Sequence, residues 1–149
     1  MDFALSEEQT AIFDMAYAFG QEHIAPHARD WEAQGTIPKD LWPQLGELGF
    51  AGLYVSEESG GSGLSRLDAT LVFEALSMAC PSVASFLSIH NMCAKMIDSF
   101  PHDDTTARVL PKALTMETVL RYFLTQPGRG SDPAALSTQA ARPARHSAL

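Results

Sequence analysis

Hydrophobic residues in the first part of the chain recur at spacings of three and four, the pattern of helices that bury one face. Ser6 with Gln9 three residues later forms a capping box and predicts the start of a first helix. Pro26 is expected to bend or shorten this helix. Its apolar face is formed by Ile12, Phe13, Ala16, Tyr17, Phe19 and Ile24.

A second helix is expected to begin near Pro38 and to end at Gly49. Its apolar positions are Leu41, Leu45 and Leu48. The segment 51–55 that follows is compatible with an extended conformation and leads into a loop over 56–63.

Ser65, with Asp68 three residues later, predicts the start of a third helix that ends at Pro81. Ser82 is the expected cap of a fourth helix, which runs to Phe100. Both helices carry apolar residues at helical spacing: Leu67, Leu71, Phe73, Ala75, Leu76 and Met78 in the third, and Val83, Phe86, Leu87, His90, Cys93, Met96 and Ile97 in the fourth. A short fifth helix is expected over 105–109, with Pro111 ending it.

The pattern changes after Thr115. The stretch 119–125, VLRYFLT, is rich in residues that favour strands and predicts one. It leads into TQPGRGSD (125–132), a predicted loop, and then into 134–140, the expected start of a second strand. A β-region of this size cannot close on itself. The sequence therefore predicts a mainly α fold, with a helical domain over 1–115 and the beginning of a truncated β-domain with a disordered tail over 116–149.

Charge and composition narrow the possible functions. The 18 acidic and 10 basic residues give a net charge of −8, which argues against nucleic-acid binding. No apolar run is long enough to cross a membrane. The acidic start, MDFALSEEQ, has no leader pattern, so a cytoplasmic location is expected. Cys80 and Cys93 lie in apolar helical stretches and are expected to be buried thiols, and His90 is expected to be a core histidine. No metal site is expected.

Three stretches carry a resemblance to a known family: GGSGLSRLDATLVFEALSMAC (60–80), SIHNMCAKMIDSF (88–100) and YFLTQPGRGSDPAALSTQA (122–140). Together they resemble the acyl-CoA dehydrogenases, and the first two most resemble the isobutyryl-CoA dehydrogenase group. The resemblance implies an amino-terminal orthogonal helix bundle, a middle β-domain and a carboxy-terminal helical bundle. It also implies FAD as hydride acceptor, an acyl-CoA substrate that a glutamate base deprotonates at Cα, an electron-transferring flavoprotein as partner, and a homotetramer.

The resemblance also assigns candidate cofactor residues, because Tyr122 to Asp132 match the family's flavin motif, YxLTEPGxGSD. By that match Tyr122, Phe123, Leu124 and Thr125 lie beside the flavin ring. Gly130 and Ser131 approach the cofactor, and Ser131 also contacts the acyl-CoA. Thr and Ser hydroxyls with the backbone N–H groups of a glycine-rich turn are suitable donors for flavin or phosphate oxygens.

Two residues depart from the family's motif. Gln126 stands where a glutamate is usual, and Arg129 stands where a small residue is usual. Arg129 would either crowd the flavin or point to solvent. After Gln139 the family continues toward a GDHYxLNG segment, whereas this chain has ARPARHSAL.

No glutamate of this chain occupies the position of the family's base, so the sequence predicts no catalytic residue and an inactive chain. Three interpretations stay open: part of an isobutyryl-CoA-type dehydrogenase, a non-catalytic helical module that associates with a full-length relative, and part of a related flavoenzyme of the acyl-CoA oxidase type.

Overall fold

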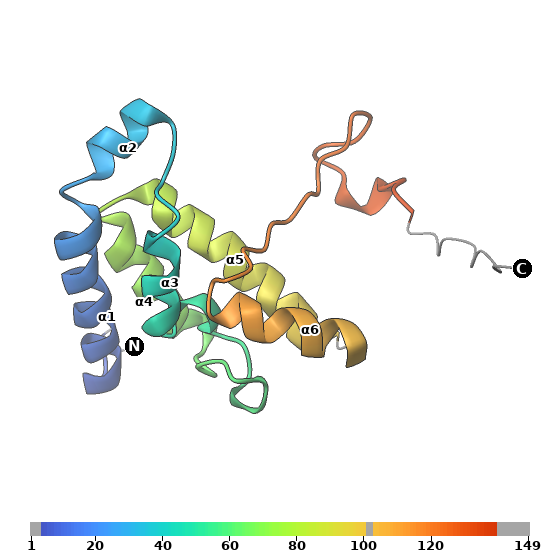
Figure 1. Cartoon of the computed structure of the whole chain (residues 1–149). Coiled ribbons are helices and arrows are strands. Elements are labelled where there is room, and N and C mark those ends of the chain that lie inside the picture. The colour runs from blue at the N-terminus through green and yellow to red at the C-terminus, as the bar shows by residue number, and fades with distance from the viewer. Residues whose placement is uncertain (1–3, 101–102, 140–149) are drawn as a thin grey trace, which may run out of the picture.

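The computed structural model describes residues 4–100 and 103–139, and Figure 1 shows a bundle of helices from which the last described segment leads away. The predicted disordered tail falls almost entirely outside the described residues, as does the end of the second predicted strand. The order of elements is α1 (Glu7–Phe19), the π-helical turn η1 (Gly20–Ile24), α2 (Ala28–Gln34), α3 (Leu41–Glu47), the 3₁₀ turns η2 (Phe50–Gly52) and η3 (Glu57–Ser59), α4 (Arg66–Ser77), α5 (Pro81–Ser99), α6 (Asp103–Leu114) and the 3₁₀ turn η4 (Pro133–Ala135).

The capping box predicted at Ser6 is present, and the helix start predicted at Ser65 has one as well. Ser6 Oγ accepts the Gln9 N–H at 3.1 Å, and Ser65 Oγ accepts the Asp68 N–H at 3.1 Å. The two caps are joined to each other, because Gln9 Nε2 donates to Asp68 Oδ1 at 2.8 Å. This contact links the N-terminal ends of α1 and α4, which pack side by side along the bundle.

The helix boundaries differ from the sequence prediction in three places. The first helix changes to π geometry at Gly20, where a Cβ atom would lie 3.2 Å from the Ala79 side chain. The sequence missed α2, in which no residue is fully buried and only Ala28 and Trp31 pack against the core. The helix predicted from Ser82 begins at Pro81, with Cys80 as its cap, because proline suits the first turn.

Two further predictions were wrong. The segment 51–55 is not extended but forms a 3₁₀ turn followed by further turns. Pro111 does not end the last helix, which continues to Leu114. Proline lacks an N–H but keeps its carbonyl, and Pro111 O still accepts the Thr115 N–H at 3.3 Å.

The core lies where α1, α3, α4 and α5 meet. Its largest fully buried side chains include Ile24, Leu45, Phe50, Leu76 and Leu87. Asn91 is buried among them and all its polar atoms are paired: its Nδ2 donates to the carbonyls of Phe50 (2.8 Å) and Leu87 (3.1 Å), and its Oδ1 accepts the Leu53 N–H at 2.8 Å. These bonds hold the turn after α3 against the middle of α5. The element order as a whole confirms the predicted mainly α fold.

The strands predicted over 119–125 and 134–140 are not formed among the described residues. Residues 119–125 have no regular structure, and Gln126 and Arg129 form a single antiparallel bridge. Residues with high β-propensity form a strand only when a neighbouring strand pairs with their backbone. No described segment pairs with 119–125, so the prediction of a strand from composition alone was wrong for this structure.

Candidate functional site

The segment that carries the candidate residues leaves the bundle at a fixed point. Met116 is buried with φ of 58°, an unusual value for a residue other than glycine, and it turns the chain sharply after α6. His90 of α5 is fully buried beside this turn. Its Nδ1 accepts the Leu120 N–H at 3.1 Å, and its Nε2 lies 3.0 Å from the Ala113 carbonyl.

These two contacts define the state of His90. Because Nδ1 accepts a hydrogen bond, the ring proton is on Nε2, which donates to Ala113 O. Burial lowers the pKa of His90, and the contact with Ala113 opposes this only in part. His90 is therefore a neutral core histidine, as the sequence predicted. It holds the end of α6 against α5, and it also holds the start of residues 117–125, which we call the exit segment.

Beyond Leu120 the chain forms a glycine-rich loop, residues 126–138. Gln126 and Arg129 exchange two backbone hydrogen bonds, of 2.8 and 3.0 Å, across a turn in which Pro127 takes the second position. Figure 1 shows this loop projecting from the bundle. A Cβ atom placed on Gly128 or Gly130 would meet nothing within 4 Å, so the backbone here is open to a ligand.

The six candidate cofactor residues lie on this one segment. Tyr122 to Thr125 form its first part, which has no regular secondary structure, and Gly130 and Ser131 lie in the bend that follows the turn. The side chains of Tyr122 and Phe123 are 42% and 86% exposed, and only Leu124 is half-buried. The structure therefore exposes five of the six candidate residues to solvent, and only Leu124 is partly covered.

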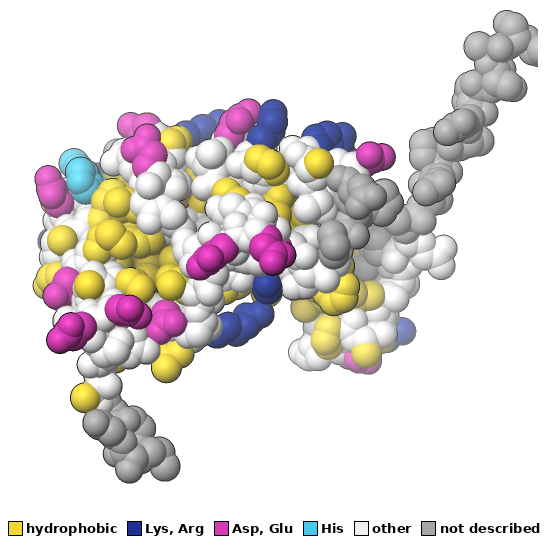
Figure 2. All heavy atoms as spheres, turned by 90° about the horizontal axis from the view of Figure 1, so that it is seen from below, with side chains coloured by type: hydrophobic (Ala, Val, Ile, Leu, Met, Phe, Trp, Pro, Cys, Tyr) yellow, Lys and Arg dark blue, Asp and Glu magenta, His cyan; other side chains and the backbone are white. Residues whose placement is uncertain are grey.

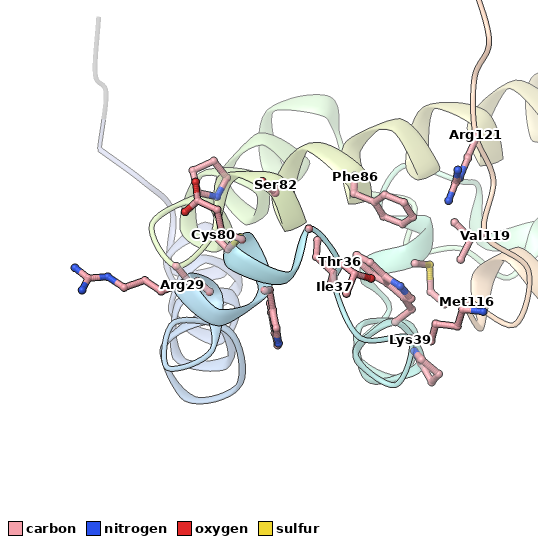
Figure 3. A pocket seen from close by; sticks show the side chains of 18 of the residues that line it. Arg29, Thr36, Ile37, Lys39, Cys80, Ser82, Phe86, Met116, Val119 and Arg121 are labelled. Atoms are coloured by element: carbon pink, nitrogen blue, oxygen red, sulfur yellow. The ribbon is translucent and has the colours of Figure 1, made fainter.

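The sequence did not predict a second feature, a wide groove of about 1300 Å³ between α2, α3, the start of α5 and the segment after α6. Its central pair is Trp42 and Phe86, whose ring centroids are 4.2 Å apart. Figure 3 shows Arg29 at one end of it, Arg121 with Val119 and Met116 at the other, and Phe86 between the two ends. We call this feature the aromatic groove. Its residues come from distant parts of the chain, so no local sequence pattern indicates it.

The surface also carries apolar side chains outside the groove. Figure 2 shows, from below, a patch of hydrophobic side chains bordered by acidic ones. Over the described residues as a whole, the most exposed large hydrophobic side chains are Phe123 at 86%, Phe100 at 80% and Leu67 at 64%. Cys80 and Cys93 are buried free thiols, and burial raises the pKa of Cys93, which disfavours its reactive thiolate form.

The glycine-rich loop and the segment before it fit one edge of a flavin nucleotide. Thr125 and Ser131 present exposed hydroxyl groups, and the space around Gly130 lets a ligand approach the backbone closely. A site that holds a cofactor tightly buries most of the ligand surface. The hydroxyl and backbone N–H donors of this segment suit FAD. The exposed rings of Tyr122 and Phe123, however, would cover only one side of the bound cofactor.

Comparisons with known proteins all relate the chain to one protein family. Residues 6–117 match the acyl-CoA dehydrogenase N-terminal domain. Isobutyryl-CoA dehydrogenases, named as mitochondrial, from Dictyostelium discoideum and Bos taurus are 44% and 43% identical over 142 residues. The alignment covers 95% of this chain but 34% of each relative, so the chain spans about a third of their length.

Solved structures extend the likeness to the fold. Glutaryl-CoA dehydrogenase from Mycobacterium smegmatis superposes with a TM-score of 0.87 at 29% identity, over 95% of this chain and 37% of that one. The FAD complex of PigA superposes with a TM-score of 0.82 at 29% identity, over 89% of this chain and 36% of that one.

None of the helices that the structure describes is long and apolar enough to cross a membrane.

The helical architecture, the match over 6–117 and the identity of 44% with a curated relative agree with one another. The chain therefore belongs to the acyl-CoA dehydrogenase family, whose N-terminal domain matches residues 6–117.

Proposed function

We propose that this chain supplies the N-terminal helical domain and the first flavin-contacting segment of an enzyme that oxidises a short branched acyl-CoA, similar to isobutyryl-CoA, to the 2,3-enoyl-CoA. The observation that carries the proposal is the identity of 43–44% with two isobutyryl-CoA dehydrogenases over 142 residues. That span extends past the N-terminal domain and so takes in much of the segment with the candidate residues. We place the domain boundary at 115/116, where the bundle ends.

In this proposal the residues of the chain bind and orient, and none transfers a proton. Tyr122 to Thr125 would lie along the flavin ring, and Gly130 and Ser131 would approach it from the bend, where the open backbone leaves room. Ser131 would also donate to the acyl-CoA. FAD, when bound, supplies the hydride acceptor for the β-hydrogen. An electron-transferring flavoprotein and a homotetrameric assembly are the partners expected for the whole enzyme.

The chain alone is expected to be inactive and colourless. A single exposed wall gives FAD too little buried contact for tight binding. Purified chain mixed with FAD, isobutyryl-CoA and an artificial electron acceptor should show no turnover. A yellow protein with a bound-flavin spectrum after desalting would contradict this expectation.

A chimera tests the positive part of the proposal. Residues 6–139 would replace the matching third of the Dictyostelium discoideum isobutyryl-CoA dehydrogenase. The chimera should retain FAD and oxidise isobutyryl-CoA in preference to a straight eight-carbon acyl-CoA. The unmodified relative is the control for folding and activity. A folded chimera that binds no FAD, or that prefers the straight-chain substrate, would overturn the proposal.

The aromatic groove favours a second candidate function, a helical module that associates with a full-length relative. Its apolar centre and its uncovered ends make it a surface that association would bury. The chain should co-elute with the relative in size-exclusion chromatography. Ile37→Asp, inside the groove, should weaken co-elution, whereas Ile89→Asp, on an exposed part of α5, should not. A chain that stays monomeric beside the relative contradicts this function.

The location is also a proposal. We expected the cytoplasm, whereas the two relatives carry a mitochondrial location in their names. Cell fractionation with an antibody against the chain distinguishes the two compartments.

A further inference from the structure

Gln126 is bound at both of its ends. Its backbone pairs with Arg129 through two hydrogen bonds, which close the turn at Pro127 and Gly128. Its side-chain Oε1 accepts both the N–H and the hydroxyl of Ser137, each at 3.1 Å. Its side-chain Nε2 donates to Thr138 Oγ1. One residue therefore joins the start of the glycine-rich loop to its end.

The side chain of Gln126 makes a ring of the chain between positions 126 and 138. Gly130 and Ser131 lie inside this ring, and Tyr122 to Thr125 lie directly before it. Without these side-chain bonds the bend would be connected to Tyr122–Thr125 only through the short turn. An amide is suited to the role because it offers an acceptor to Ser137 and a donor to Thr138 from the same group.

We propose that Gln126 is a positioning residue, which closes the glycine-rich loop and thereby holds Gly130 and Ser131 in a fixed relation to Tyr122–Thr125. Its meaning for a flavin site rests on the proposed function, whereas the closure itself is a property of this chain. A carboxylate at this position would keep the ring, because it accepts from Ser137 and from the Thr138 hydroxyl. A methyl side chain would open it.

Arg129 provides a direct test, because trypsin cleaves after arginine and a protease needs several residues in an extended conformation. In the native chain the closed loop should slow cleavage after Arg129. Gln126→Ala should accelerate it about tenfold, the factor that corresponds to losing about 1.4 kcal/mol of hydrogen bonding. Cleavage after Arg121, which lies outside the ring on the exposed exit segment, is the internal standard and should not change.

Gln126→Glu is the matched variant and should restore slow cleavage at the weakly alkaline pH of the assay. Unfolding of the bundle followed by circular dichroism should be the same in all three proteins, because the loop is outside the core. The proposal is overturned if Gln126→Ala is cleaved after Arg129 no faster than the native chain, or if Gln126→Glu is cleaved as fast as Gln126→Ala. The assay contains no flavin, so failure of the FAD proposal in the chimera leaves its result unaffected.

Discussion

The Nδ1 atom of His90 accepts the backbone N–H of Leu120 at 3.1 Å, and this contact determines where the chain leaves the helical bundle. On its other side the same ring donates to Ala113 at the end of α6. Replacing His90 by alanine would leave the Leu120 N–H without its partner, would leave Ala113 O with only the Met116 N–H, and would create a cavity. The free energy of unfolding should fall by about 3 kcal/mol. Urea denaturation measures it, and His27→Ala, at an exposed position, should change it by less than about 0.5 kcal/mol.

His90 should also make the stability of the bundle depend on pH. Protonation of Nδ1 would place an N–H against the N–H of Leu120, and burial lowers the folded-state pKa of the ring. The unfolded chain titrates near about 6.5. Between that value and the lower folded pKa, the unfolded state binds more protons than the folded state. The contribution of His90 to stability is therefore fully present above about pH 6.5 and declines as the pH falls.

Urea denaturation at pH 7.5 and pH 5.0 checks this expectation. The charged groups on the elements around His90 include the pair formed by Lys112 and Glu117 and the pair formed by Lys95 and Asp98, and neither contributes to its pKa shift. His90→Gln removes the titrating ring and should show a smaller loss of stability on acidification. An equal loss in the native chain and in this variant would assign the effect to other groups.

Asp98 holds the loop after η2 against α5. Its carboxylate accepts from Ser56 N (3.2 Å), Ser56 Oγ (2.7 Å), Ser59 Oγ (2.6 Å) and Lys95 Nζ (2.8 Å). Burial raises the pKa of Asp98, but the hydrogen bonds from Lys95, Ser59 and Ser56 outweigh it and hold the pKa well below its usual range. This contribution is present above about pH 3.9 and is lost as pH falls toward the folded pKa.

Asp98→Ala should lower the free energy of unfolding by about 2–3 kcal/mol, because four donor groups lose a charged acceptor. The loop 56–63 should exchange its amide hydrogens faster, since it loses its attachment to α5. Asp14→Ala removes an exposed carboxylate from α1 and is the control. Equal hydrogen exchange in the loop of both variants would contradict the assigned role.

Gly46 lies where α3 approaches the chain after α6. A Cβ atom there would be 2.8 Å from the Thr115 carbonyl oxygen and 2.9 Å from its carbon, both backbone atoms. Alanine gains about 1 kcal/mol of helix propensity over glycine, whereas overpacking against backbone costs about 1–3 kcal/mol. The clash should win, and Gly46→Ala should lower the melting temperature. Gly128→Ala, in open space, should leave it unchanged.

The sequence predicts well those features that are determined within one turn of helix. Ser6 and Gln9, like Ser65 and Asp68, are three residues apart, so their capping boxes are visible in the printed chain and present in the structure. The buried state of His90 follows from its place on an apolar face. The helix α2 was missed because only Ala28 and Trp31 of Ala28–Gln34 pack against the core, which is too few to show a helical period.

The features that the sequence could not give depend on contacts between distant residues. A strand needs a partner, so the β-formers at 119–125 were not sufficient to predict one. Gln126 contacts a residue eleven positions away, and the aromatic groove joins three separate stretches of the chain, 28–43, 79–86 and 116–121. The six candidate cofactor residues came from the family's motif, and their role stays a prediction.

The link between the two capping boxes gives a last prediction. Gln9 Nε2 donates to Asp68 Oδ1 at 2.8 Å, and hydrogen bonds from Ser65 and then Gln9 lower the pKa of Asp68. Each alanine replacement removes a cap contribution of about 1 kcal/mol and the shared bond between α1 and α4. In a double-mutant cycle Gln9→Ala and Asp68→Ala should therefore couple by about 0.5–1 kcal/mol. Glu8→Ala combined with Asp68→Ala should be additive, because Glu8 is exposed and is not part of the link. If Gln9 and Asp68 are equally additive, the two caps act separately and packing alone joins the helices.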